Sequence, residues 1–202
     1  TLVGLSKLLA GAESIEHITE LAEGGDLENI DLRGFHCHIG SQAFASSVYI
    51  ATVDVMVDFL AEMKATFGYS AEKLDIGGGY GVRYLESDPE IDIASNIALV
   101  GQAVRAQCET LGLEMPSIRM EPGRSIVADS GITVYTVGAV KKIEGYKNYV
   151  SVDGGMTDNP RFALYGSSYT VLPVNNLSVP RYKACSVVGR CCESGDILQE
   201  NV

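Results

Sequence analysis

Two stretches of the chain carry apolar residues at the spacing of an amphipathic helix. The first runs from Val48 to Phe67 and the second from Ile93 to Leu113. Because a helical turn takes about 3.6 residues, positions three and four apart fall on one face that can pack against a core. The positions that define these faces are Val53, Val57, Leu60, Met63, Phe67, Ile97, Val100, Val104 and Leu111. The sequence therefore predicts two helices, the second of them ending near Gly112.

Short apolar segments precede and follow these helices. They are Ile30–His38, Leu74–Ile76 and Ile118–Glu121, and each runs into a polar or glycine-rich motif. Strands that alternate with helices of this length are typical of parallel βα units. In a βα barrel the active site lies at the carboxyl ends of the strands, so these motifs are the candidate site. A closed barrel needs about 250 residues, so the barrel portion is expected to be incomplete.

The pattern changes after Gly131. Three segments have the composition of strands: Ile132–Val137, Tyr149–Asp153 and Tyr182–Val188. The prolines at 160, 173 and 180 are expected to break any helix in this region. We therefore predict an α/β protein, in which residues 1–130 are the C-terminal portion of a βα barrel and residues 131–202 are part of a β-rich domain.

Composition narrows the classes of partner. Hydrophobic residues make up 46% of the 202 positions, which is enough for a core. The formal net charge of −11 argues against nucleic acid or an anionic membrane as the main partner. No stretch approaches the roughly 20 apolar residues of a membrane span. The first residues, Thr1–Gly4, do not open a secretory signal.

The cysteines indicate a reducing compartment. Their number is odd, and no metal-like Cys-x-x-Cys spacing occurs among Cys37, Cys108, Cys185, Cys191 and Cys192. We expect five reduced thiols in a cytoplasmic protein.

Two motifs at strand ends suggest binding of a phosphate and of a flat ring. Gly77, Gly78 and Gly79 allow backbone N–H groups to surround a phosphate, although a flexible turn explains them equally well. His36 and His38 alternate on one face of a strand, a spacing that could suggest zinc, but the nearest further ligands, Cys37 and Gln42, suit a metal poorly. A histidine at the strand end is a better candidate for stacking on a flat cofactor.

Three further motifs carry charged or nucleophilic side chains. Glu121 and Arg124 suit a ring nitrogen and an anion, or else form a local salt bridge. Arg161 and Tyr165, four positions apart, can converge on one anion, although ordinary turn chemistry also explains their loop. The pair Cys192–Glu193 either takes part in catalysis or is simply a buried thiol beside a solvated carboxylate.

Taken in order, these motifs resemble the diaminopimelate decarboxylase family of pyridoxal-phosphate enzymes. The resemblance rests on His38-Ile39-Gly40-Ser41-Gln42, Gly77-Gly78-Gly79, Glu121-Pro122-Gly123-Arg124, Asp158-Asn159-Pro160-Arg161 and Cys192-Glu193-Ser194-Gly195-Asp196. It implies the C-terminal part of a TIM-like (β/α)8 barrel that binds pyridoxal 5′-phosphate, followed by part of a β-rich domain. It also implies decarboxylation of meso-diaminopimelate to L-lysine in a cytoplasmic homodimer.

The resemblance assigns the cofactor to the barrel motifs. His38 would be catalytic and stack on the pyridine ring. Ser41 and the loop Gly77, Gly78 and Gly79 would hold the phosphate. Glu121 would pair with the ring nitrogen, and Gly123 belongs to the same cofactor-binding motif.

The resemblance assigns the substrate to charged residues of both parts. Arg124, at the edge of the cofactor site, would meet a substrate carboxylate. Arg161, Tyr165 and Glu193 would recognise the far end of the amino acid. Cys192 would be catalytic and reach the reacting carbon from a neighbouring subunit.

Two features of the family are missing from the chain: its cofactor lysine, and a late tyrosine downstream of Cys192–Asp196 that contacts the phosphate. The family's cofactor lysine precedes the histidine motif, and the one lysine upstream of His38 is Lys7, whose surroundings do not match. We therefore expect a fragment without decarboxylase activity. Two alternatives remain: a catalytically inactive, decarboxylase-like binding or regulatory protein, and another basic amino-acid decarboxylase of the same fold, such as those for ornithine or arginine.

Overall fold

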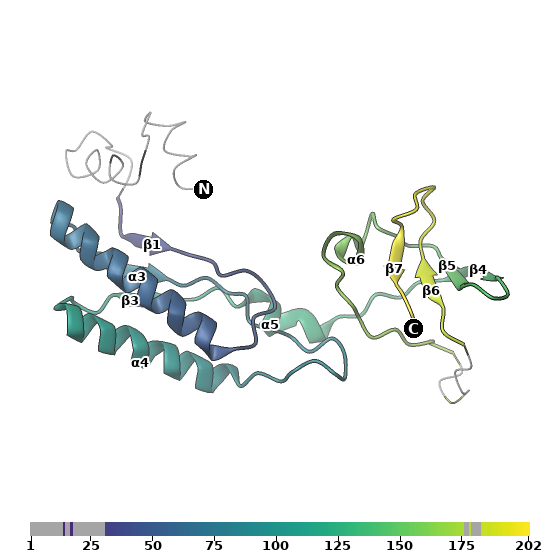
Figure 1. Ribbon diagram of the computed structural model, residues 1–202, viewed down its shortest axis with the longest axis horizontal. Helices are drawn as coiled ribbons and strands as arrows, with labels where there is room; N and C mark the ends of the chain where they lie inside the picture. Colours follow the sequence, from purple (N-terminus) through teal and green to yellow (C-terminus); the bar gives the residue numbers. More distant parts are fainter. Residues whose placement is uncertain (1–13, 15–16, 18–30, 176–177, 179–182) are drawn as a thin grey trace. The chain divides into compact units, whose positions relative to one another are not determined.

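The computed structural model describes residues 31–175 and 183–202, together with positions 14, 17 and 178 (Figure 1). Its residues form two compact units. The first contains the described residues up to Val82 and Pro89–Ala128, and the second contains Arg83–Asp88 and Asp129–Val202. Lys7 and Ile30 lie outside the described residues.

A three-stranded parallel sheet organises the first unit. Its strands are β1 (Gly34–His36), β2 (Lys73–Asp75) and β3 (Ser117–Arg119), in the order β1-β2-β3. Helix α3 (Ser46–Phe67) connects the first two strands and helix α4 (Ile93–Leu111) the next two (Figure 1). The prediction of successive βα units is therefore confirmed.

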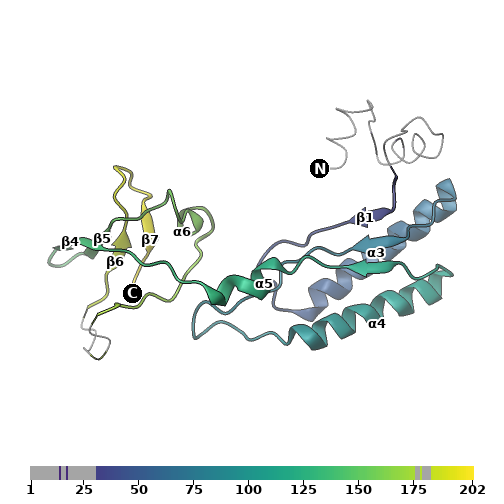
Figure 2. The ribbon, with the colours of Figure 1, turned by 180° about the vertical axis from the view of Figure 1, so that it is seen from behind.

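The two helices pack against each other and against the sheet (Figure 2). The buried face of α3 consists of Tyr49, Val53, Val57, Leu60 and Met63, and that of α4 consists of Asn96, Val100, Val104 and Cys108. The sequence placed Ile97 and Leu111 on the buried face of α4, but both are exposed, because burial follows the four-residue steps from Asn96 to Cys108.

Capping residues set the ends of these helices. The Asp92 side chain accepts a hydrogen bond from the Ser95 N–H at 3.0 Å and so caps the start of α4. Gly68 and Gly112, with φ of 70° and 65°, end α3 and α4 in the left-handed conformation that glycine adopts without strain. The predicted end of the second helix at Gly112 is confirmed.

The sheet has one apolar and one polar face. Phe35 and Leu74 are buried in the core that the helices cover. Since side chains alternate along a strand, their neighbours project to the opposite face, where His36, Asp75 and Arg119 are register partners at the last positions of the three strands.

The second unit is a four-stranded mixed sheet. Its strands are β4 (Val137–Lys142), β5 (Asn148–Val152), β6 (Ser186–Val188) and β7 (Ile197–Gln199), in the order β4-β5-β6-β7. Only the β5–β6 pair is parallel. Val152, Val187 and Leu198 form its small core.

The predicted strand at Ile132–Val137 is wrong, because the strand begins at Val137 and runs to Lys142. Ile132 and Val134 are largely exposed, and the paired register with β5 starts only at Val137. Residue composition shows only that a segment is compatible with a sheet. The position of the strand depends on which of its residues can pair with the backbone of a neighbouring strand. Of the predicted strand Tyr182–Val188, only Ser186–Val188 forms one, and Tyr182 lies outside the described residues.

Short elements near the motifs were not predicted. They are α5 (Gly123–Val127), the 3-10 helix η1 (Ala128–Ser130), α6 (Arg161–Tyr165) and strand β7. Pro160 does not break a helix but precedes α6, because proline is compatible with a helix start, where its missing N–H has no helical partner.

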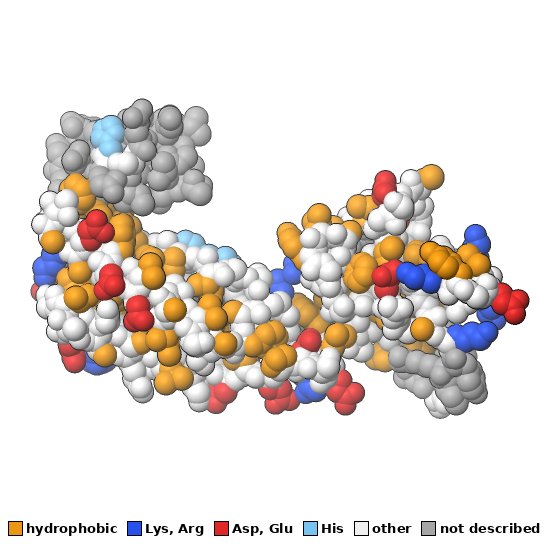
Figure 3. Space-filling model, in the orientation of Figure 1, with side chains coloured by type: hydrophobic (Ala, Val, Ile, Leu, Met, Phe, Trp, Pro, Cys, Tyr) orange, Lys and Arg blue, Asp and Glu red, His pale blue; other side chains and the backbone are white. Residues whose placement is uncertain are grey.

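Many apolar side chains remain on the surface. Val55 is 68% exposed, and Ile97 and Leu99 are each 42% exposed on α4. Apolar side chains also appear on the surface of both units in Figure 3. In the described part of the chain, no helix is long and apolar enough to cross a membrane.

Candidate active site

The carboxyl ends of β1, β2 and β3 bring the three barrel motifs together. Hydrogen bonds between neighbouring segments continue beyond the strands: the Cys37 N–H donates to the Asp75 carbonyl at 2.9 Å, and the Glu121 N–H donates to the Gly77 carbonyl at 2.8 Å. The parallel alignment therefore extends into the motifs and holds their side chains at one edge of the sheet.

The glycine loop packs directly against both neighbouring motifs. A Cβ atom on Gly78 would lie 2.0 Å from the carbonyl oxygen of Glu121, and one on Gly79 would lie 2.0 Å from that of Gly40. Gly77 and Gly79 also have φ of 68° and 92°. The absence of side chains is therefore needed for close approach of the three loops, which a merely flexible turn would not require.

His38 is exposed and held at one edge of its ring. The Gly78 N–H donates to His38 Nδ1 at 3.4 Å. The Gly77 N–H donates to Asp75 Oδ1 at 2.8 Å, so the amides of Gly77 and Gly78 are both engaged within the chain. A phosphate at this loop would have to compete with these bonds or use the other donors nearby, such as Gly79 and the exposed Ser41.

A contact that sequence analysis missed joins the outer two motifs. His36 Nε2 lies 3.3 Å from Glu121 Oε2, and one ligand atom from each of His36, Asp75 and Glu121 falls within 4.8 Å of the others. These three side chains are the described residues that could hold a cation. The zinc ligands considered from the sequence were His36 and His38 with Cys37 or Gln42, and this set does not come together. The Gln42 side chain is engaged elsewhere: its amide group donates to the Val82 carbonyl at 3.0 Å, and its oxygen accepts from the Val82 N–H at 2.8 Å. The sequence feature that could have indicated the contact between His36 and Glu121 is the position of His36 on the polar face of its strand.

Arg124 lies in α5 and does not pair with Glu121 in the described part of the chain. Its Nη1 atom is buried and has no hydrogen-bond partner among the described residues. A buried guanidinium nitrogen without a partner is costly, so its position fits an anionic ligand better than the local salt bridge considered from the sequence.

Helix α6 places Arg161 and Tyr165 side by side. The guanidinium carbon of Arg161 lies 5.5 Å from the centre of the Tyr165 ring, as expected for residues four apart on a helix. Arg161 Nε is buried without a hydrogen-bond partner among the described residues, and Tyr165 is 71% exposed. The two side chains therefore lie together in the structure, and their convergence on one anion stays a prediction.

The loop after β6 presents Cys192 and Glu193. Cys192 is exposed, so the alternative of a buried thiol is wrong at this position. The Glu193 carboxylate accepts hydrogen bonds from the Gly195 N–H at 3.3 Å and the Ser194 hydroxyl at 3.1 Å. The Gly195 N–H, followed by the Ser194 groups, holds the pKa of Glu193 below its usual value.

Asp196 anchors this loop from inside the second unit. It is 3% exposed, and its carboxylate accepts from the N–H groups of Met156 and Cys191, both at 2.6 Å. Burial alone would raise the pKa of Asp196, but these N–H groups outweigh burial and lower it. Asp196 thus ties the loop that carries Cys192 to the segment before α6, a role that sequence analysis did not assign.

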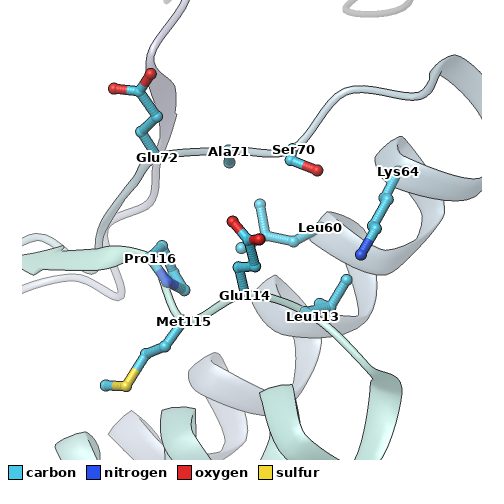
Figure 4. Close-up of a pocket in the computed structure, with 9 residues that line it drawn as sticks. All are labelled: Leu60, Lys64, Ser70, Ala71, Glu72, Leu113, Glu114, Met115 and Pro116. Atoms are coloured by element: carbon cyan, nitrogen blue, oxygen red, sulfur yellow. The ribbon is translucent and has the colours of Figure 1, made fainter.

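A small hollow lies at the opposite end of the first sheet (Figure 4). It measures about 100 Å³ and is lined by Leu60, Lys64, Ser70, Ala71, Glu72, Leu113, Glu114, Met115 and Pro116. These segments precede β2 and β3, so the hollow is at the amino ends of the strands. In βα barrels that end serves stability rather than chemistry.

The arrangement defines a class of protein: an α/β chain whose parallel strands end in a candidate cofactor site and which continues into a mixed sheet. Residues 5–128 match the family model described as "Pyridoxal-dependent decarboxylase, pyridoxal binding domain". The chain therefore belongs to the family of pyridoxal-dependent decarboxylases.

Individual relatives agree with this family. The chain is 40% identical over 171 residues to a diaminopimelate decarboxylase of Bacillus subtilis, covering 85% of this chain and 39% of that protein. It is also 40% identical over 195 residues to a diaminopimelate decarboxylase of Actinosynnema pretiosum, covering 96% of this chain and 42% of that protein. The chain thus spans about two fifths of these relatives.

Solved structures confirm the fold. The diaminopimelate decarboxylase of M. jannaschii in complex with L-lysine matches with a TM-score of 0.73 and 28% identity, over 95% of this chain and 42% of that one. A lysine/ornithine decarboxylase of Vibrio vulnificus matches with a TM-score of 0.73 at 22% identity, over 93% of this chain and 49% of that one, and shows the fold alone. The predicted fold, the end of a TIM-like barrel followed by part of a β-rich domain, is confirmed.

Proposed function

We propose that this chain is the part of a diaminopimelate decarboxylase that holds the ring and phosphate of pyridoxal 5′-phosphate and recognises the substrate. The proposal rests chiefly on the convergence of three motifs at one sheet edge, in the order of the family's strands. The 40% identity to diaminopimelate decarboxylases supports this substrate over ornithine or arginine. Residues 1–130 would then be the pyridoxal-binding part and residues 131–202 part of the β-rich domain.

The described residues fit the cofactor. His38 offers an exposed ring after β1, and the Glu121 carboxylate follows β3, the other outer strand of the sheet. The phosphate would be held by Ser41 and the loop from Gly77 to Gly79, which is free of side chains. Since Gly77 and Gly78 already donate within the chain, we expect Gly79 to be the main backbone donor.

The substrate would be recognised by polar and charged side chains. Arg124, with Gly123 beside it, would meet the carboxylate next to the cofactor, which gives its buried Nη1 atom a partner. Arg161 and Tyr165 would grip the far carboxylate of meso-diaminopimelate, and Glu193 the far amine. Cys192 would act across the interface of a cytoplasmic homodimer, which its exposure permits.

These roles divide the chemistry of decarboxylation. Pyridoxal phosphate, when bound, supplies an electron sink for the charge left by loss of CO₂. Glu121 would hold a proton at the ring nitrogen, because a carboxylate stabilises a positive charge there. The Cys192 Sγ atom would return a proton to the reacting carbon. Arg161 and Tyr165 would confer selectivity, because a substrate without the far carboxylate leaves the buried Nε atom of Arg161 unpaired.

Binding of pyridoxamine 5′-phosphate to the 202-residue chain tests the cofactor site. This ligand carries the same ring and phosphate and forms no covalent bond with lysine, so calorimetric titration reports the site directly. We expect saturable binding that Glu121→Gln weakens about tenfold, since a hydrogen bond to a charged group contributes about 1.5 kcal/mol. The exposed substitution Glu109→Gln on α4 is the matched control and should leave binding unchanged.

Absence of binding by the wild-type chain would contradict the proposed cofactor site. Equal effects of Glu121→Gln and Glu109→Gln would remove Glu121 from it. We also expect the chain by itself to release no CO₂ from meso-diaminopimelate, and measurable release would contradict the prediction of an inactive fragment.

A further inference from the structure

The Glu121 carboxylate is poorly restrained by burial. Its side chain is 60% exposed, and it follows a strand of only three residues. A side chain in this setting samples several rotamers, and holding one of them costs conformational entropy when a ligand binds. The contact with His36 Nε2 at 3.3 Å restrains it in the structure.

A second carboxylate makes this contact more important. Asp75 stands beside His36 in the sheet register, and its carboxylate lies within 4.8 Å of the ligand atoms of His36 and Glu121. Two carboxylates this close repel each other, and repulsion would turn the exposed Glu121 side chain toward solvent. A carboxylate oxygen can only accept, so His36 must donate through Nε2. His36 thus supplies a donor where two acceptors meet.

We propose that His36 is a positioning residue that holds the Glu121 carboxylate toward the nitrogen of the cofactor ring against the repulsion of Asp75. This inference rests on the proposed function, since it needs the ring nitrogen to meet Glu121. His36 acts through Glu121, and among the described residues no hydrogen bond joins its side chain to the loop from Gly77 to Gly79. Its effect is therefore specific to ligands that carry a ring nitrogen.

Paired ligands separate this role from a structural one. Pyridoxamine 5′-phosphate presents both the ring nitrogen and the phosphate, whereas benzyl phosphate has an aromatic ring and a phosphate but no ring nitrogen. We expect His36→Ala to weaken binding of pyridoxamine 5′-phosphate about fivefold, the cost of fixing one mobile side chain. Binding of benzyl phosphate should stay within twofold of wild type. His36→Gln, whose side-chain amide can donate to Glu121, should bind both ligands as the wild type does.

Removing the repulsion supplies an independent test. Asp75→Asn keeps an oxygen that can accept from the Gly77 N–H but removes the charge. In the double variant His36→Ala/Asp75→Asn, affinity for pyridoxamine 5′-phosphate should recover most of the fivefold loss. Failure to recover would overturn the role assigned to Asp75.

The outcomes distinguish the inference from the proposed function. If His36→Ala binds pyridoxamine 5′-phosphate as tightly as the wild type, or loses both ligands equally, His36 is not a positioning residue. If the wild-type chain binds neither ligand, the proposed function fails. In that case, nitrogen NMR of the His36 ring tests the contact between His36 and Glu121. The substitution Glu121→Gln should shift the His36 Nε2 signal, and an unchanged signal would refute the contact.

Discussion

Replacement of Gly78 by alanine tests the packing of the candidate site most directly. The added Cβ atom would lie 2.0 Å from the Glu121 carbonyl oxygen and 2.8 Å from its carbonyl carbon, whereas ordinary contacts begin at 3.4 Å. The two loops would have to separate by more than an ångström. Gly78 lacks the positive φ of its neighbours, so the effect isolates packing from backbone conformation.

The magnitude follows from the nature of the obstructing atoms. They belong to the backbone, which cannot turn aside as a flexible side chain does. Overpacking of a tight site costs about 3 kcal/mol when the backbone must move. With a urea dependence of about 2 kcal/mol per molar, the unfolding midpoint should fall by about 1.5 M. Affinity for pyridoxamine 5′-phosphate should fall as well, because the displaced segment carries Glu121.

Urea unfolding followed by circular dichroism is a suitable assay, because the long helices α3 and α4 are both in the first unit. Gly101→Ala is the matched control, since Gly101 lies within α4 and a Cβ there meets nothing within 4 Å. Alanine in a helix interior should stabilise the chain by about 0.8 kcal/mol. If Gly78→Ala is as stable as the wild type, the three loops are not packed against one another.

Three further substitutions test other parts of the structure. Val57→Ala should lower the free energy of unfolding by about 2 kcal/mol, because Val57 is fully buried. The control Val55→Ala, at an exposed position, should change it by less than about 0.5 kcal/mol. Equal urea midpoints for the two variants would contradict the assigned core. Asp92→Ala removes the cap of α4 and should lower that free energy by about 1 kcal/mol, measured in the same way. Asp196→Asn tests the pH dependence of stability. Since folding lowers the pKa of Asp196, its stabilising effect is full at neutral pH and is lost as pH falls through the pKa of the folded state. The variant should therefore be less stable than the wild type at pH 7 but lose less stability on acidification. Identical stability–pH curves for variant and wild type would contradict this role.

The sequence determined the elements whose pattern is long and regular. The apolar spacing from Val48 to Phe67 reflects the core that α3 covers, and the ends of both helices follow from local glycine conformations. The sequence also located the ends of the three parallel strands, because each short apolar segment runs directly into a motif of glycines, histidines or a carboxylate. These features depend on neighbours close in the sequence.

Other features depend on residues far apart in the chain. The strand expected at Ile132 begins only at Val137, because β5 offers backbone partners from that point. The roles of Asp196 and His36 were missed for the same reason, since their partners lie 40 and 85 positions away.

The sequence by itself thus determined the order of the βα units, the extent of the two long helices and the motifs of the candidate site, because helix periodicity, capping and turn chemistry are local. Only the tertiary structure decided which motif atoms meet. The glycine loop illustrates the difference: its composition allows many conformations, and the backbones of the two adjacent motifs select one by leaving no room for a side chain at Gly78 and Gly79.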